Sequence, residues 1–118
     1  MAISFFFSFD PRLNEWISVA PMINDRSDFF ACSDKNKIFV FGGKSQQGPI
    51  SKCEQYDPST NCWTEIAELP IAIYNCAGMV TECGKILLSG GFQKNRHNST
   101  YNTFLAYCPE KVTFIVVL

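Results

Sequence analysis

The apolar residues of this chain occur in short runs separated by turn-forming residues, a pattern that predicts strands rather than helices. The clearest run covers residues 38–41 and ends in a pair of glycines, Gly42 and Gly43. A second run, 86–88, is followed by Ser89 and another glycine pair. Because every residue of 38–41 is apolar, we expect this strand to be buried on both faces. Two consecutive glycines indicate a close backbone approach or a sharp exit from the strand.

A turn element that ends in tryptophan is also repeated. Residues 10–16 read DPRLNEW and residues 57–63 read DPSTNCW, so Trp16 recurs as Trp63 after 47 residues. Proline presets φ at the first turn position, and Asn61 tolerates the left-handed conformation that returns the chain. The element therefore predicts a tight hairpin followed by a large side chain to bury. A period near fifty residues, marked by paired glycines and tryptophan, is typical of β-propeller blades.

Each repeat is expected to form the four short strands of a propeller blade. The expected strands are 27–33, 38–41, 52–56 and 63–66 in the complete copy, 5–9 and 16–19 before it, and 75–81, 85–89, 103–107 and an imperfect 112–118 after it. The sequence therefore predicts an all-β fold, an incomplete propeller of about two and a half four-stranded blades. The second half of one blade covers 5–19, a complete blade covers 20–66, and a third blade covers 67–118.

A propeller closes with roughly 4–8 blades. We therefore expect this chain to be a fragment or truncated form of a longer propeller, with unmatched apolar surface at its ends. Self-association into a composite ring is the less favoured alternative.

The composition agrees with a β-rich core, since 47% of residues are hydrophobic and 14% are aromatic. The formal charge is −1 and no basic run is present, which argues against nucleic acid as a partner. No apolar stretch approaches the roughly 20 residues needed to span a membrane. The six cysteines have irregular spacing, and Cys32 is in register with Val80. We therefore expect reduced thiols and a cytoplasmic location.

With these motifs the chain resembles the kelch repeat family over roughly residues 9–107. The resemblance rests on the DPxxNxW elements, the apolar strands with their glycine pairs, and the segment 20–22 (Ala-Pro-Met) with Arg26. The second copy is aligned with Leu69 and Pro70 in place of Pro-Met, and with Tyr74 in place of Arg26. The Pro-Met-x-x-x-Arg form is most similar to kelch-like proteins with BTB and BACK domains.

That resemblance implies a propeller that holds a protein substrate for a cullin–RING ubiquitin ligase. The cullin would be reached only through a BTB region, and no BTB-like segment is found in these 118 residues. The expected function is therefore a non-enzymatic protein-interaction module. The alternative is a cytoskeletal scaffold whose kelch blades bind actin-associated partners.

The resemblance places the recognition face in the loops that enter the first strand of each blade and in those that follow the glycine pairs. Positive side chains would bind acidic groups, aromatic side chains would stack, and amides would bind backbone. The candidate residues are Arg26, Ser27, Lys44, Gln46, Gln47, Tyr74, Asn75, Phe92, Asn95 and Arg96. For Arg26 an equally weighted alternative is a set of hydrogen bonds that ties adjacent blades together. For most of the loop amides and Arg96 the alternative is simple solvation.

Catalytic chemistry finds little support in the sequence. His97 is the only histidine, and it has no cysteine or carboxylate at a spacing typical of a catalytic or metal site. A copper-oxidase propeller would need several such ligands. The glycine pairs are not followed by the Lys-Ser/Thr of a phosphate-binding loop. We therefore expect no catalytic residue, no metal and no cofactor.

Overall fold

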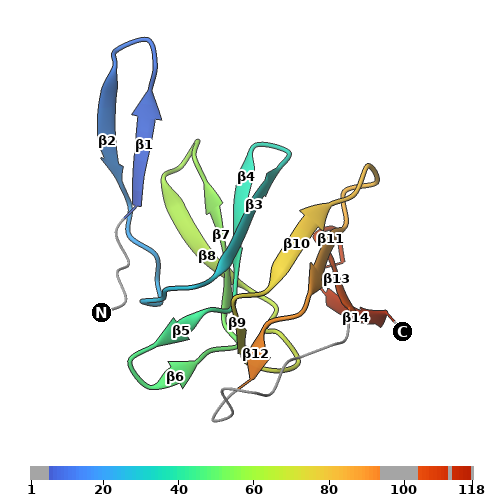
Figure 1. The fold of residues 1–118 in the computed structure, drawn as a ribbon. Coiled ribbons are helices and arrows are strands. Elements are labelled where there is room, and N and C mark those ends of the chain that lie inside the picture. Colours follow the sequence, from blue (N-terminus) through green and yellow to red (C-terminus); the bar gives the residue numbers. More distant parts are fainter. Residues whose placement is uncertain (1–5, 94–103, 112, 118) are drawn as a thin grey trace.

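The computed structural model describes residues 6–93, 104–111 and 113–117, and within these ranges every regular element is a strand (Figure 1). The all-β prediction is confirmed. In the same ranges no helix is long and apolar enough to cross a lipid bilayer.

Two four-stranded antiparallel sheets form the body of the structure. The middle blade has the order β3-β4-β7-β8, and the last blade has the order β10-β11-β13-β14. In each blade the strands follow one another as a meander, as in a propeller. Their bounds are β3 Phe30–Asp34, β4 Lys37–Phe41, β7 Cys53–Asp57, β8 Cys62–Ile66, β10 Ala77–Val80, β11 Ile86–Ser89, β13 Phe104–Cys108 and β14 Thr113–Val117.

Three smaller pairs complete the described fold. The first hairpin, β1 Phe6–Asp10 with β2 Glu15–Val19, precedes the middle blade. Two short pairs lie beyond the glycine pairs: β5 Lys44–Ser45 with β6 Gly48–Pro49, and β9 Ile73–Tyr74 with β12 Phe92–Gln93.

The first strand of each blade is shorter than predicted. The sequence predicted strands over 27–33 and 75–81, whereas the structure has β3 at Phe30–Asp34 and β10 at Ala77–Val80. The reason is that Asp28 and Asn75 adopt left-handed conformations, with φ of 55° and 56°, which interrupt an extended strand. Ser27 pairs with Lys44 in an isolated bridge instead.

The last blade has a regular fourth strand even though its turn has lost the repeated aspartate. The amide of Lys111 donates to the carbonyl of Cys108 at 3.2 Å, as the amide of Thr60 donates to that of Asp57 at 3.3 Å. The backbone bond therefore closes the turn whichever side chain stands first. Phe114 then pairs with Tyr107 in register, as Trp63 pairs with Tyr56.

The main core lies between the middle and last blades. Phe39 and Phe41 of β4 pack against buried side chains of the last blade, and the ring of Phe41 lies 5.6 Å from that of Tyr107 and 6.1 Å from that of Phe114. Val40 faces the other way, into a second cluster with Trp63. The predicted burial of this strand on both faces is confirmed.

Trp63, the second of the repeated tryptophans, joins the middle blade to the segment before it. Trp63 is 9% exposed, and its indole N–H donates to the carbonyl of Ala20 at 2.7 Å. Asn61, left-handed as predicted with φ of 53°, accepts from the Ala20 amide and the Tyr56 hydroxyl. Trp16 occupies the same place in the first hairpin but is 71% exposed, because no described blade precedes it.

The two tryptophans should differ sharply in their contribution to stability. Trp63→Phe removes the bond to Ala20 and should lower the free energy of unfolding by about 1–2 kcal/mol. Trp16→Phe, the matched control, should change it by no more than about 0.5 kcal/mol in the monomer, because the side chain is exposed in the single chain. Urea unfolding followed by circular dichroism measures both, and equal losses would contradict the assignment of Trp63 to an interior contact.

Candidate recognition face

The loops that the sequence marked as a recognition face gather at one end of the blades. In Figure 1, β5, β6, β9 and β12 lie together at the lower end, and the β3–β4 and β10–β11 turns lie at the upper end. The structure therefore separates two loop faces, and the candidates Lys44 of β5, Tyr74 of β9 and Phe92 of β12 belong to the lower one.

The glycine pairs let the backbones of adjacent segments approach at this end. Gly42 and Gly43 have φ of 60° and 99°, and the amide of Gly43 donates to the carbonyl of Ile73 in the linker to the next blade at 2.9 Å. A Cβ added to Gly42 would lie 2.5 Å from that carbonyl oxygen, and one added to Gly43 would lie 2.6 Å from the carbonyl oxygen of Ser27. Only glycine fits such positions. The predicted close approach is confirmed.

Lys44 follows the first glycine pair and is held in place by two neighbours. Its ammonium lies 3.6 Å from a carboxylate oxygen of Asp28 and 4.7 Å from the centre of the Tyr74 ring. Tyr74 in turn lies 5.5 Å, ring centre to ring centre, from Phe92, its partner in the β9–β12 pair. We call these four residues the recognition cluster. It combines a cation–π contact with an aromatic pair.

Backbone bonds fix the recognition cluster from both adjacent blades. Ser27 and Lys44 exchange two hydrogen bonds of 3.0 and 2.9 Å. The amide of Asn75 donates to the carbonyl of Asp28 at 2.8 Å and so joins the linkers that enter the two blades. Asp28 was not among the sequence candidates. The strand pairings set it opposite Asn75, another residue that tolerates left-handed φ, but the sequence alignment did not bring these two residues together.

Two further candidates lie in the loop after Lys44 and outside the recognition cluster. Gln46 and Gln47 are exposed at the tip of the β5–β6 hairpin, where the amide of Gln47 donates to the hydroxyl of Ser45. Asn95 and Arg96 lie outside the described residues.

Arg26 belongs to the interior, so its interpretation as a surface group for acidic partners is wrong. It is 1% exposed and donates to the carbonyls of Gly42 and Lys52, each at 2.7 Å, and to the carboxylate of Glu54 at 2.6 Å. Glu54 also accepts from the amide of Ile23 at 2.7 Å. The alternative is right that Arg26 acts through internal hydrogen bonds but wrong about what they join: Arg26 ties the linker before β3 to the ends of β4 and β7 within the same blade, not to an adjacent blade.

The strand pairings also correct the alignment of the two copies. Ser27 pairs with the residue after the first glycine pair, and Tyr74 with the residue after the second. Tyr74 therefore takes the place of Ser27, and Ile73 takes the place of Arg26. The sequence alignment, which set Tyr74 opposite Arg26, is wrong by one residue.

The buried charges of the middle blade are replaced by apolar side chains in the last blade. The strand registers place Leu105 where the middle blade has Glu54, and Leu105 and Ile73 are both buried in the main core. The same shift places Pro70, which has no N–H to satisfy, at the position of Ile23. A charged pair and an apolar pair thus fill equivalent positions in the two blades. Removing a buried ion pair as a unit is tolerated far better than removing one of its members.

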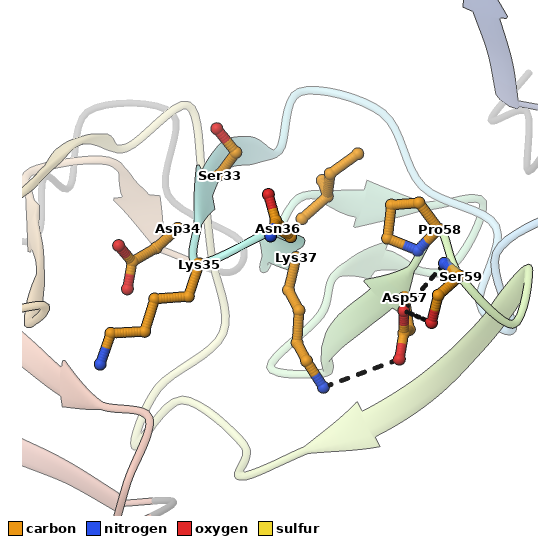
Figure 2. Close-up of a pocket in the computed structure, with 9 residues that line it drawn as sticks. Ser33, Asp34, Lys35, Asn36, Lys37, Asp57, Pro58 and Ser59 are labelled. Atoms are coloured by element: carbon orange, nitrogen blue, oxygen red, sulfur yellow. Dashed lines mark hydrogen bonds and ion pairs between the residues drawn. The ribbon is translucent and has the colours of Figure 1, made fainter.

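The opposite face carries an open cavity of about 990 Å³ between the β3–β4 and β7–β8 turns (Figure 2). The side chains that line it stabilise those turns: Lys37 lies 3.9 Å from Asp57, which accepts hydrogen bonds from the amide and hydroxyl of Ser59. The bonds from Ser59 hold the pKa of Asp57 below its ordinary value. Among the described residues no group of three or more His, Cys, Asp or Glu side chains could hold a metal ion.

The cysteines are all free thiols, and their surroundings differ. Cys53 is fully buried beneath the last blade, and burial raises the pKa of its thiol to about 12. Cys83 is exposed in the β10–β11 turn, 3.2 Å from the hydroxyl of Thr81, and this hydrogen bond lowers the pKa of the Cys83 thiol.

Comparison with known proteins agrees with this architecture. Residues 25–70 match the family model of the Kelch motif. The chain is 37% identical over 90 residues to Kelch-like protein 36 of Rattus norvegicus and 34% identical over 92 residues to Kelch-like protein 26 of Danio rerio. The chain belongs to the kelch repeat family. These alignments cover 76% and 77% of this kelch chain but only 14% and 15% of the relatives.

The fold of this kelch chain also resembles a larger solved structure. It superposes on the structure of YjhT with a TM-score of 0.83 and 16% sequence identity, and the match covers 97% of this chain and 45% of that one. This likeness concerns the fold alone. An incomplete propeller is the architecture that the sequence predicted.

Removing one member of the buried ion pair should be more damaging than removing both. Glu54→Leu leaves the guanidinium of Arg26 buried and unpaired, which should cost about 3–5 kcal/mol of unfolding free energy. The double variant Arg26→Ile, Glu54→Leu copies the last blade and should recover a large part of this loss. Urea unfolding measures both variants; a double variant that is no more stable than Glu54→Leu would show that the pair is not a replaceable unit.

Thiol labelling at pH 8 should distinguish the two cysteines. A lowered pKa gives Cys83 a larger thiolate fraction, whereas Cys53 stays protonated and covered, so Cys83 should react first and Cys53 only after unfolding. Thr81→Val should slow the labelling of Cys83 and leave that of exposed Cys62 unchanged. Mass spectrometry of the labelled peptides gives the rates, and early labelling of Cys53 in the folded chain would contradict the structure.

Proposed function

We propose that this kelch chain is a non-enzymatic recognition module that binds a protein partner through the recognition cluster. The observation that supports this most directly is the contact of Lys44 with Tyr74, whose ring in turn lies tilted beside that of Phe92. Aromatic side chains held by backbone pairing present a large contact area at a small entropic cost.

The charges at the cluster narrow the chemistry of the partner. Arg26 is buried in an ion pair with Glu54, so among the described residues of the cluster the positive charge comes from Lys44. Asp28 partly neutralises that charge. A strongly acidic partner would also meet the exposed Asp25 and Asp28. The cluster therefore favours a segment that lays an apolar or aromatic side chain on Tyr74 and Phe92 and offers a single acceptor to Lys44.

We further propose that the bound partner is a substrate of a cullin–RING ubiquitin ligase and that binding takes place in the cytoplasm. The support is the similarity to Kelch-like proteins, of whose length this chain spans about 14–15%. The cullin would be contacted by a BTB region outside these 118 residues, so that the described blades would supply recognition alone.

Affinity purification with the 118-residue chain as bait tests the recognition step. Lys44→Ala and Tyr74→Ala should each reduce recovery of a specific partner about tenfold, equivalent to about 1.4 kcal/mol. Lys35→Ala is the matched control, since Lys35 forms a similar exposed ion pair, 3.7 Å from Glu110, on the opposite face. A partner lost equally with all three variants would refute binding at the recognition cluster.

The ligase step needs a separate measurement. When the blades are joined to a BTB region in cells, the captured partner should acquire ubiquitin in the wild type but not in Tyr74→Ala. Recovery of a cullin would support this step, whereas co-sedimentation of the chain with filamentous actin would favour a scaffold and count against it.

A further inference from the structure

The first hairpin carries an open apolar face that is covered at the equivalent place in the middle blade. Phe9 pairs with Trp16 in the same register as Tyr56 with Trp63. Phe9 is 43% exposed and Trp16 71%, whereas Tyr56 and Trp63 are 5% and 9% exposed. The hairpin face is therefore that side of a blade on which a preceding blade would pack.

The last blade carries the opposite kind of open face. Phe104 pairs with Ser89 as Cys53 pairs with Phe41, yet Phe104 is 52% exposed and Cys53 is fully buried. Ile115 lies across the strand pair on the same face and is also exposed. This is the side of a blade on which a following blade would pack.

These two open faces are the two halves of an interface that the structure already contains once. Between the middle and last blades, Phe41 on the face of the middle blade packs against Tyr107 and Phe114 on the face of the last blade. By register, Phe9 and Trp16 stand where Tyr107 and Phe114 stand. The hairpin of one molecule therefore matches the outer face of the last blade of another.

We propose that two copies of this chain associate head to tail, each hairpin packing on the last blade of the other, to close one ring. Each copy supplies three blade positions, one of them the hairpin alone, so that two copies supply about six, within the roughly 4–8 of closed propellers. The chain covers 45% of the YjhT chain, and twice 45% is 90%. Two such contacts, each the twofold-related copy of the other, give a closed symmetric dimer.

The closed ring has a consequence for recognition. The recognition clusters of the two copies would lie on the same rim, so that a partner could contact Lys44 and Tyr74 twice. In a longer polypeptide, further blades would occupy the same two open faces and displace the second copy.

Sedimentation equilibrium of the 13.3 kDa chain tests the ring directly, since the expected mass is twice that of the monomer. Trp16→Lys and Phe104→Glu each put a charge on one open face and should each give monomers. Mixing these two variants should restore a dimer, because one contact is then wild type and the other pairs lysine with glutamate. Ile23→Lys is the matched control, because Ile23 is exposed in the linker and lies on neither face.

Circular dichroism of every variant checks that its strands remain. A wild-type monomer at all concentrations, or a dimer that survives both charged variants, would overturn the proposal. A series of larger species would overturn ring closure. These results are independent of partner capture, which is measured with Lys44 and Tyr74 variants that leave both open faces unchanged.

Discussion

The burial of one sheet face against the next is the interaction on which the rest of the structure depends. A four-stranded blade has two broad faces. Because strand β4 is apolar on both of them, each face must be covered by other parts of the protein. Phe39 and Phe41 are covered by the last blade, and Val40 by the cluster that contains Trp63. The hydrophobic effect thus acts between blades as much as within them, which makes each blade dependent on its neighbours.

The recognition cluster inherits its geometry from this stacking. Gly43 and Asn75 form backbone bonds that cross between the segments of neighbouring blades. These bonds bring Lys44 of one blade over Tyr74, which enters the next. The cluster is therefore a property of the interface between blades, and a single isolated repeat could not reproduce it.

Local signals in the sequence predicted the local structure well. The proline and Asn61 predicted the turn, and the paired glycines predicted close backbone approach, because each depends on the conformational range of one or two residues. The role of Arg26 was not decided by its neighbours in sequence. Its burial depends on Glu54, which is 28 residues away, and no local pattern reveals such a partner.

Residues with a left-handed backbone explain why the predicted bounds of some strands were wrong. Asp28 and Asn75 shorten the first strands of the two blades. The one-residue error in the alignment of the copies has a different cause: Val80 and Ile86, which close the β10–β11 turn, are six residues apart, whereas the equivalent Ser33 and Ile38 are five apart. An apolar pattern alone reports which side chains are buried, but not where an extended segment is interrupted. The strand bounds and the membership of the recognition cluster therefore needed three-dimensional information.

The exchange of Arg26 and Glu54 for Ile73 and Leu105 limits how the repeats of such a protein can be recombined. A genetic crossover could transfer the linker before the first strand (with Arg26 or Ile73) without the third strand of the same blade (with Glu54 or Leu105). It would then place isoleucine beside a carboxylate, or arginine beside leucine. Either hybrid would enclose a lone charge. Linker and third strand must therefore be inherited together, although some thirty residues separate them along the chain.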